Sequence, residues 1–464
     1  MVTTPARPVT RRPAKQASRR PARGKPAPDA RGTARPAAGA PEQPGTEPAQ
    51  LGRVQSQPGR VQSQPGRVQS QPGRVQRFLR EFWPRLEGSN RPSNGSSYYM
   101  ILGATVALTC IGLMMVFSAS SAESISNGAD PYQLGLRESL YAAIGLFLMF
   151  LFSRFSKRLL KRLAWPALGL ALVLLALVLV IGVEINGNTN WIRFNDNFSF
   201  QPSEAAKLGL ALWMAAVLAR KGPLLSQWKH MFIPVLPVAA LVVGLVLKQG
   251  DLGTAVIMMA IVAAALFFAG APGRIFAGAG IVGALAALIL AATSSNRVSR
   301  ITAWIDALHG TCNDPTGQCD QARNGLYALA SGGWWGVGLG QSRQKWNWIP
   351  EAHNDFIFSI IGEEFGLIGT IVVVVLYAII ALAIFRVIVR HNDLFVRILC
   401  GAILAWIIGQ AFVNIAMVTG LLPVIGVPLP LVSYGGTALV LVLSAIGVVL
   451  SFARTAPESE PAEP

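Results

Sequence analysis

The chain has 464 residues, of which 52% are hydrophobic and 14% charged. Its apolar residues fall in runs long enough to cross the roughly 30 Å hydrocarbon core of a bilayer, which excludes an ordinary soluble fold. Only helices and closed barrels satisfy every backbone polar group inside a bilayer, and residues 371–385 lack the alternation of barrel strands. The sequence therefore predicts an all-α polytopic membrane protein.

The formal net charge of +17 would suggest a nucleic-acid partner, but most of it belongs to residues 1–98, which hold 18 Lys and Arg and five Asp and Glu. This segment is rich in Pro, Gly, Ala, Gln and Arg, and it repeats GRVQSQP three times from Gly52. Its composition predicts a disordered cytoplasmic tail that meets anionic lipid headgroups rather than nucleic acid. Within it, residues 75–87 have the pattern of a short helix lying on the membrane surface.

Ten transmembrane helices are predicted from hydrophobic runs bounded by Gly, Pro and charge. They lie near residues 99–119, 138–153, 163–183, 203–219, 231–248, 252–269, 273–293, 357–385, 395–418 and 434–453. Lys and Arg cluster in the connections 154–162, 220–230 and 386–394, so the positive-inside rule predicts that both termini are cytoplasmic. Residues 99–454 then form one membrane domain, and residues 455–464 form a short acidic cytoplasmic tail.

The connection at residues 294–356 is the longest one predicted on the outer side, and long loops are usually functional or disordered. Cys312 and Cys319 both lie in it, where a disulfide can form outside the cytoplasm. A zinc site is the alternative, but a structural zinc normally has four ligands, and His309 is the only nearby addition. The disulfide is the preferred interpretation.

Ionisable and aromatic side chains gather in the same loop, and carboxylates beside tryptophans are typical of a carbohydrate-facing site. Spacing does not select a catalytic base among them, and any one carboxylate could instead cap a turn. The residues are Asp306, Asp314, Asp320, Arg323, Lys345, Glu351, His353 and Asp355, beside Trp304, Trp334, Trp335, Trp346 and Trp348.

A second cluster is FQPSEAAK at residues 200–207, where Pro202 is suited to the first turn of a helix. Glu204 and Lys207 are one turn apart, so they can pair on one face near the helix end. The pair could be functional or a structural salt bridge. Just before it, Arg193 lies at the expected membrane boundary, where it could bind phosphate or anchor the chain at the interface.

Two further features lie near the C-terminal helices. Glu363 and Glu364 are predicted to open a helix, which indicates a polar cavity or complementation of the helix dipole. Residues 419–437 contain three prolines and several glycines, so they cannot form a continuous helix. Broken backbone of this kind is tolerated in a membrane only against protein or water.

Five motifs occur in one order: FQPSEAAK, QGDLGTA, NDPTGQCDQ, GVGLGQSRQKWNWIPEAHNDFIFSIIGEEFG and GLLPVIGVPLPLVSYGGT. Together they resemble the SEDS family (shape, elongation, division and sporulation) across residues 99–454. The wording PEAHNDFIF, with VFSAS from Val116, is more similar to the cell-division branch than to the elongation branch. The excess of Arg over Lys and the abundance of Ala are typical of a high-GC bacterium such as an actinobacterium.

The resemblance implies a peptidoglycan glycosyltransferase that polymerises lipid II during septal wall synthesis. It assigns catalysis to the Asp of a D-P-x-G-x-G-Y-Q motif, which is Asp314 here. Cys319 and Asp320 stand where Gly and Tyr are usual, and a Cys312–Cys319 disulfide would clamp the catalytic turn. The resemblance also implies that Glu204 and Lys207 interact in a central cavity.

The predicted reaction is an inverting transfer in which Asp314 accepts the proton of the acceptor 4-hydroxyl, whose oxygen attacks C1 of the donor muramyl sugar. The lipid diphosphate leaving group needs cations, with Arg193, Lys207, Arg323 and Lys345 as candidates. A divalent cation, Mg or Mn, could share this role. Further residues expected at the substrate or in the cavity are Gln321, Glu351, His353, Asp355, Glu363 and Glu364.

The resemblance further implies a multi-pass protein of the bacterial plasma membrane, located at the division septum. Its expected partners are lipid II, a class B penicillin-binding transpeptidase and other division proteins. Three alternatives stay open: a lipid II flippase, since buried charge and broken helices also mark transport paths, a noncatalytic division scaffold, and an elongation-type polymerase.

Overall fold

The structure is a computed structural model that describes residues 94–454 except 127, 186–187, 196–197, 226, 279, 281–294, 313–316 and 347. It is dominated by helices, as predicted. The N-terminal tail, its expected surface helix and the acidic C-terminal tail lie outside the described residues. The long helices are α2 (Asn94–Ser126), α3 (Gln133–Phe152), α4 (Lys157–Ile181), α5 (Pro202–Arg220), α7 (Val235–Lys248), α8 (Leu252–Ala269), α12 (Ile357–Arg390), α13 (Leu394–Val418) and α14 (Thr437–Arg454).

Eight helical segments in the described part of the chain are long and apolar enough to cross a membrane. They are α2, α3, α4, the stretch Lys229–Lys248 that includes α7, α8, α12, α13 and α14. The predicted run 203–219 corresponds to α5, which is buried among the other helices and carries two ionisable side chains near its start. The predicted run 273–293 lies largely outside the described residues, so the count of ten stays a prediction.

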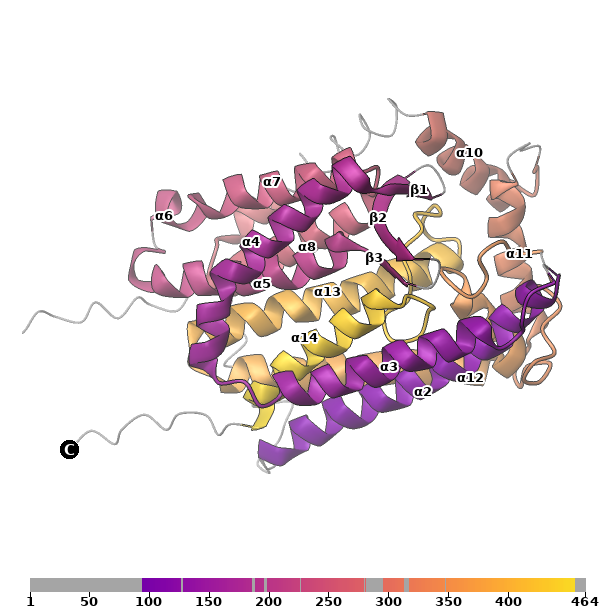
Figure 1. Cartoon of the computed structure of the whole chain (residues 1–464), viewed down its shortest axis with the longest axis horizontal. Coiled ribbons are helices and arrows are strands. Elements are labelled where there is room, and N and C mark those ends of the chain that lie inside the picture. Colours follow the sequence, from indigo (N-terminus) through magenta and orange to yellow (C-terminus); the bar gives the residue numbers. More distant parts are fainter. Residues whose placement is uncertain are drawn as a thin grey trace, which may run out of the picture. The chain divides into compact units, whose positions relative to one another are not determined.

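The helices pack as two groups around α5 and α13 (Figure 1). Helices α4, α7 and α8 contact α5 on one side, and α2, α3, α12 and α14 pack together on the other. Close approach of α3 and α14 requires glycine at two positions. A Cβ atom added at Gly145 would lie 2.5 Å from Leu443 Cδ1, and one added at Gly447 would lie 2.4 Å from Met149 O. Small residues at such crossings are typical of membrane helix packing.

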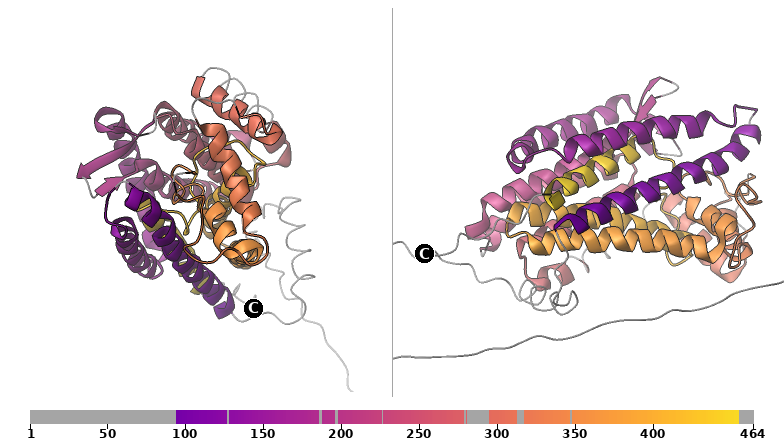
Figure 2. Two further views of the ribbon diagram at one scale, coloured as in Figure 1. Left: turned by 90° about the vertical axis from the view of Figure 1, so that its right-hand side faces the viewer. Right: turned by 90° about the horizontal axis from the view of Figure 1, so that it is seen from below.

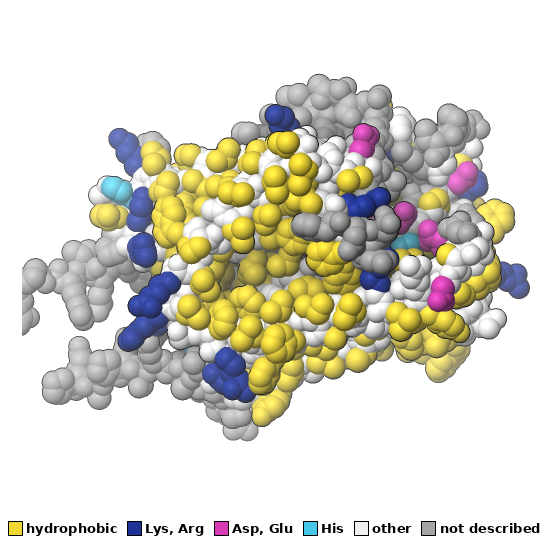
Figure 3. Space-filling model, in the orientation of Figure 1, with side chains coloured by type: hydrophobic (Ala, Val, Ile, Leu, Met, Phe, Trp, Pro, Cys, Tyr) yellow, Lys and Arg dark blue, Asp and Glu magenta, His cyan; other side chains and the backbone are white. Residues whose placement is uncertain are grey.

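Charge is distributed unevenly between the two ends of the bundle. Hydrophobic side chains cover the middle; one end carries Lys and Arg without visible Asp or Glu, and the other carries Asp and Glu together with further Lys and Arg (Figure 3). At the basic end Lys157 pairs with Asp393 at 2.8 Å. Burial opposes ionisation of Asp393, but Lys157 and Lys161 hold the pKa of its carboxyl below the usual range. This distribution favours the predicted cytoplasmic position of the basic end.

The connection at 294–356 contains two helices, α10 (Ser295–His309) and α11 (Gln318–Ser331), which the sequence interpretation did not assign. A three-stranded antiparallel sheet also forms, from β1 (Val183–Ile185), β2 (Asn188–Asn195) and β3 (Phe198–Phe200). Figure 1 and Figure 2 place these helices and this sheet at the same end of the bundle. We call it the loop end.

Residues 419–436, named here the junction segment, contain no helix, as their prolines and glycines predicted. Side chains from three helices, α10, α12 and α13, bond their backbone carbonyls, which is how irregular backbone is accommodated inside a membrane protein. The bonds run from Gln410 to Pro428 O (3.0 Å), from Asn414 to Val427 O (2.7 Å), from Trp304 to Gly420 O (2.8 Å), from Arg300 to Val424 O (3.4 Å) and from Tyr377 to Pro430 O.

Candidate functional site

The first polar network contains the predicted pair on α5. Lys207 Nζ lies 2.7 Å from Glu204 Oε1, and both side chains are almost completely buried. The ammonium also donates to Gln410 Oε1 at 2.9 Å and lies 5.0 Å from the centre of the Trp406 ring. The second oxygen of Glu204 has no hydrogen-bond partner among the described residues.

Local sequence explains why this pair forms. Helix α5 begins at Pro202, as predicted, so Glu204 lies in the first turn near the unpaired backbone N–H groups. Gln410 connects the pair to the junction segment because its amide also donates to Pro428 O. A buried ion pair is tolerated only when additional bonds compensate its desolvation, and Gln410 supplies one.

Asp251, in the QGDLGTA motif, connects the sheet to the start of α5. Its carboxylate caps α8 by accepting from Thr254 N at 2.9 Å. The other carboxylate oxygen accepts from Asn190 at 3.2 Å and from Gln201 at 3.1 Å. Asp251 therefore connects three parts of the chain: β2, the residue that precedes α5, and the start of α8.

The second network lies at the loop end around Lys345. Its ammonium contacts Glu364 Oε1 at 3.1 Å, Ser118 Oγ at 3.0 Å and Gly340 O at 2.8 Å. Ser118, on α2, also donates to Glu364 at 2.7 Å. Three acceptors match the three N–H groups of a lysine, so this cation is fully engaged inside the protein.

Glu363, next to Glu364 on α12, binds the same part of the loop. Its carboxylate accepts from the Ser342 hydroxyl and from Arg343 N at 2.9 Å. Helix α12 begins at Ile357, the predicted start, so the two glutamates do not open it as the sequence interpretation expected. They lie in its second turn, and their side chains hold the preceding loop rather than complementing the helix dipole.

The third network surrounds His353. Its Nδ1 lies 2.9 Å from Glu123 Oε2 on α2, and Nε2 lies 3.8 Å from Glu351 Oε2. Its backbone carbonyl accepts from Tyr434 N at 3.0 Å. Burial lowers the pKa of the imidazole, but the carboxylates of Glu123, Glu351 and Asp355 outweigh this effect and leave the pKa raised.

Glu138 bonds the junction segment directly, and Asp355 is connected to it through Asn414, which also donates to Val427 O. Glu138, on α3, accepts from Gly435 N at 3.3 Å and from Gly436 N at 3.0 Å. The Asp355 carbonyl accepts from Asn414 at 2.8 Å. Burial raises the pKa of the Asp355 carboxyl to about 6.

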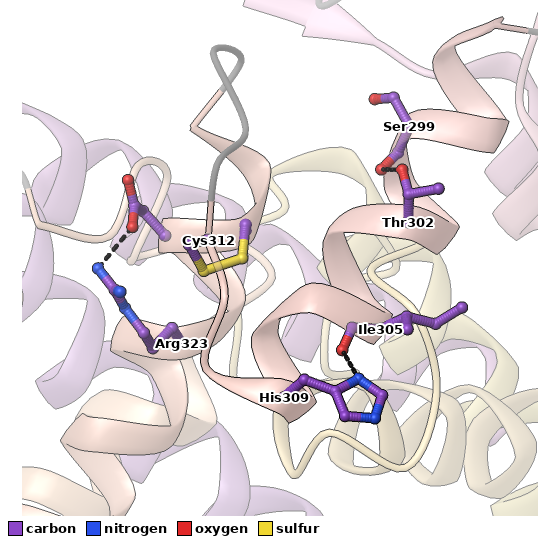
Figure 4. Close-up of a disulfide and its surroundings, with 8 residues drawn as sticks. Ser299, Thr302, Ile305, His309, Cys312 and Arg323 are labelled. Carbon is purple, nitrogen blue, oxygen red and sulfur yellow. Dashed lines mark hydrogen bonds and ion pairs between the residues drawn. A yellow bond between two sulfur atoms is a disulfide. The ribbon is translucent and has the colours of Figure 1, made fainter.

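The turn expected to carry the catalytic base is bounded by a disulfide between Cys312 and Cys319 (Figure 4), with a Cα–Cα distance of 5.6 Å. Asp314 itself lies outside the described residues. Gln321, on α11, donates to Pro350 O at 3.0 Å. Arg323 is partly exposed and pairs with Asp320 at 2.6 Å.

The four cations proposed for the leaving group divide into two kinds. Lys207 and Lys345 are buried in ion pairs. Arg193, on β2, is exposed, and Arg323 is partly exposed. Lys207 and Lys345 are therefore already engaged by acceptors inside the protein. Among the described residues, no group of three or more His, Cys, Asp and Glu side chains could hold a metal ion.

Several side chains in these networks were not selected from the sequence. Two sequence signals could have identified most of them: ionisable residues near the ends of apolar helices, and two amide side chains spaced four apart on one helix. These residues are Ser118, Glu123, Glu138, Asp251, Gln410 and Asn414.

The family model of FtsW, RodA and SpoVE, described as a cell cycle protein, matches residues 99–458. The chain belongs to this family. The expected SEDS resemblance is thus confirmed. A probable peptidoglycan glycosyltransferase FtsW of Mycobacterium tuberculosis is 39% identical over 366 residues, covering 78% of this chain and 69% of the relative. Stage V sporulation protein E of Bacillus subtilis is 34% identical over 352 residues, covering 75% and 95%.

Two solved structures support the fold. A chain from a peptidoglycan synthase complex, studied for its coordination of polymerization and crosslinking, is 30% identical with a TM-score of 0.62, covering 76% of this chain and 96% of that one. The crystal structure of the rod shape determining protein RodA from Thermus thermophilus is also 30% identical, with a TM-score of 0.56 and coverage of 77% and 96%. The protein is therefore a multi-pass membrane protein with this fold.

Proposed function

We propose that this protein is a peptidoglycan glycosyltransferase that polymerises lipid II during septal wall synthesis. The observation that carries the proposal is the 39% identity to relatives named for this activity. The family match at residues 99–458 includes the three polar networks and the disulfide-bounded turn. Relatives named FtsW are 36–39% identical, against 30% for RodA, which favours the division role over elongation.

In the proposed reaction, the Asp314 carboxylate takes the proton from the 4-hydroxyl of the acceptor sugar. The acceptor oxygen forms a bond to C1 of the donor muramyl sugar while the bond from C1 to the diphosphate oxygen breaks. The configuration at C1 inverts, and the lipid diphosphate leaves with the bonding electron pair. The proton ends on Asp314 and returns to solvent.

The described residues support this chemistry by positioning. The Cys312–Cys319 disulfide closes a short ring that contains Asp314 in sequence. Gln321 and Lys345 attach the flanking parts of the loop to Pro350 and to α12. Precise placement of a base and two substrates can account for a large part of an enzyme's rate enhancement.

Arg193 is the strongest of the four predicted cations for the leaving diphosphate. It is exposed on β2, close in sequence to the start of α5, whereas Lys207 and Lys345 already have acceptors inside the protein. A guanidinium can bind phosphate oxygens in a bidentate manner. A divalent cation, Mg or Mn, stays a prediction that activity measured against added metal would test.

The proposed setting is the septal plasma membrane, with both termini cytoplasmic and the loop end outside. A lipid-linked donor explains why the enzyme is built from membrane helices, since the lipid tail stays in the bilayer. The proposed partner is a class B penicillin-binding transpeptidase together with other division proteins. A relative's structure within a peptidoglycan synthase complex supports a partner of this kind.

The test is glycan polymerisation on labelled lipid II by purified full-length protein, alone and with the transpeptidase. Asp314→Ala and Asp314→Asn are compared with wild type. Asp320→Asn is the matched control, because it removes a carboxylate from the same loop that pairs only one turn away with Arg323. We expect polymer from wild type and the control, and none from either Asp314 variant.

Polymer from a folded Asp314 variant would refute that base. An absence of polymer from every sample, including wild type with its partner, would refute the glycosyltransferase. Translocation of labelled lipid II without polymer would then favour the flippase, and the absence of both activities would favour the scaffold.

A further inference from the structure

Trp334 and Trp335 are the two most exposed tryptophans of the described loop, with 67% and 81% of their surfaces accessible. They follow α11 and precede Val337 and Leu339, which are also about half exposed. We call residues 332–339 the tryptophan turn. A cluster of large exposed apolar side chains often marks an interaction site.

The tryptophan turn is fixed to a break in α12 at Gly366, where φ is +65°. Leu367 N donates to Gly333 O at 2.9 Å, and Ile368 N donates to Trp334 O at 3.3 Å. A Cβ atom added at Gly336 would lie 2.1 Å from Glu364 O, so the two backbones touch. The backbone of the tryptophan turn is therefore fixed beside Gly366, and it has little freedom to move along the axis of α12.

The lipid-facing surface of α12 begins at the same height. The exposed apolar residues of this surface are Leu367, Ile368, Ile371, Val372, Val374 and Val375. Gly366 and the first basic residue toward the other end, Arg386, are 20 positions apart, which is about 30 Å of helix. This length equals the hydrocarbon thickness of a bilayer. In the right-hand view of Figure 2, α12 lies on the face turned toward the viewer.

We propose that Trp334 and Trp335 insert into the bilayer interface at the loop end and anchor the long loop at the depth of the α12 break. Tryptophan rings favour the boundary between hydrocarbon and headgroups, where an apolar ring and a polar N–H are both accommodated. The anchor places Lys345, Glu363 and Glu364 just beyond the hydrocarbon, at the level of lipid headgroups. It does not depend on which reaction the protein catalyses.

Trp348 provides a matched comparison within the same loop. It is 63% exposed, and its carbonyl accepts from Asn324 on α11. Helix α11 runs along α12, with Gly325 against Phe356 and Gly332 against Gly362. Asn324 is next to Gly325, so the Trp348 backbone is held near Phe356, before the start of α12 and ten residues before the break at Gly366. Trp348 is therefore placed beyond the tryptophan turn, on the side away from the exposed apolar surface of α12.

The test measures depth with nitroxide labels on full-length protein in lipid bilayers without any partner. Trp335→Cys and Trp348→Cys are made in a Cys110→Ala background, because Cys400 is buried and Cys312 and Cys319 are joined. Relaxation by oxygen, which partitions into lipid, is compared with relaxation by a water-soluble nickel chelate. We expect the oxygen-to-nickel ratio to be several-fold higher at position 335 than at position 348.

Equal ratios, or a lower ratio at position 335, would overturn the anchor and leave the turn as a surface for a protein partner. A second measurement needs no label and covers the case in which a cysteine variant does not fold. Brominated lipids should quench less of the total fluorescence in the Trp334→Phe/Trp335→Phe variant than in wild type. Trp348→Phe should not reduce the quenched fraction, and equal quenching in all three proteins would contradict the proposal.

Discussion

Glu204–Lys207 and Lys345–Glu364 are both buried lysine–glutamate pairs, but they connect different things. The first is local, with its two residues three apart on α5. The second joins the long loop to α12, and Ser118 extends it to α2. The local pair lies inside the bundle and is connected to the junction segment through Gln410. The long-range pair attaches the loop to α12. Losing each pair should therefore have distinct consequences.

The largest effect is expected from Lys345→Met, which leaves Glu364 buried without its cation. Breaking a buried pair by removing one partner typically costs about 3–5 kcal/mol. The apparent unfolding midpoint should fall strongly, and limited proteolysis should cut the loop between α11 and α12. Arg343→Met is the matched control, because it removes an exposed cation whose contact to Glu363 comes from its backbone. An equal loss in both variants would contradict the role of the long-range pair.

Lys207→Met should destabilise less, by about 3 kcal/mol at most, because the first turn of α5 still offers backbone N–H groups to Glu204. Loop proteolysis should stay as in wild type. The double variant Glu204→Gln/Lys207→Met should recover most of the lost thermal stability, since no buried charge remains. A double variant less stable than Lys207→Met would show that Glu204 has another partner.

The disulfide should matter for activity more than for the bundle. Cys312→Ser/Cys319→Ser removes a restraint of about 2 kcal/mol on a short loop, which corresponds to a rate loss of up to roughly thirtyfold if the proposed catalytic turn loses its order. The polymerisation rate on lipid II measures this, with Cys110→Ser as the control. A change in the unfolding midpoint without any change in rate would separate the disulfide from catalysis.

The smallest expected effect is the pH dependence at His353. Its pKa is raised in the folded protein, so its contribution to stability is complete below the unfolded pKa of about 6.5 and is lost as the pH rises through the folded value. Glu123→Gln removes the partner that raises this pKa. The variant's unfolding midpoint should therefore depend less on pH above about 6.5.

The titration of the Asp355 carboxyl can be distinguished from that of His353. Its pKa of about 6 is also raised, so its stabilising contribution is present below the unfolded pKa and falls as the pH rises toward 6. Asp355→Asn should remove the change in midpoint between about pH 4 and 6 and keep the change at higher pH. The same pH profile in Glu123→Gln and Asp355→Asn would contradict the assignment to two separate groups.

The local pair was predictable from the sequence, and the long-range pair was not. Glu204 and Lys207 were predicted to interact because helical spacing puts them on one face, and Pro202 marked the start of that helix. Broken backbone after residue 418 followed from its prolines and glycines. Such features depend on local chemistry, which a sequence displays directly.

The long-range contacts were not predictable in the same way. Nothing in the loop indicates that Lys345 lies beside Ser118, which is 227 positions earlier. Glu123 and Glu138 lie near the ends of apolar helices, but only the fold brings them to His353 and to the junction segment. Helices α10 and α11 were missed because their mixed charge obscured any long apolar run. Asp314 remains predicted by family motif alone.

The most direct test of the central claim is the linkage in the product made from lipid II by the purified wild-type protein with its transpeptidase partner. We expect a glycan polymer that a muramidase specific for β-linked strands degrades completely to disaccharide units, as inversion at C1 requires. A folded, active-site-intact protein that makes no polymer, or a polymer resistant to that muramidase, would contradict it.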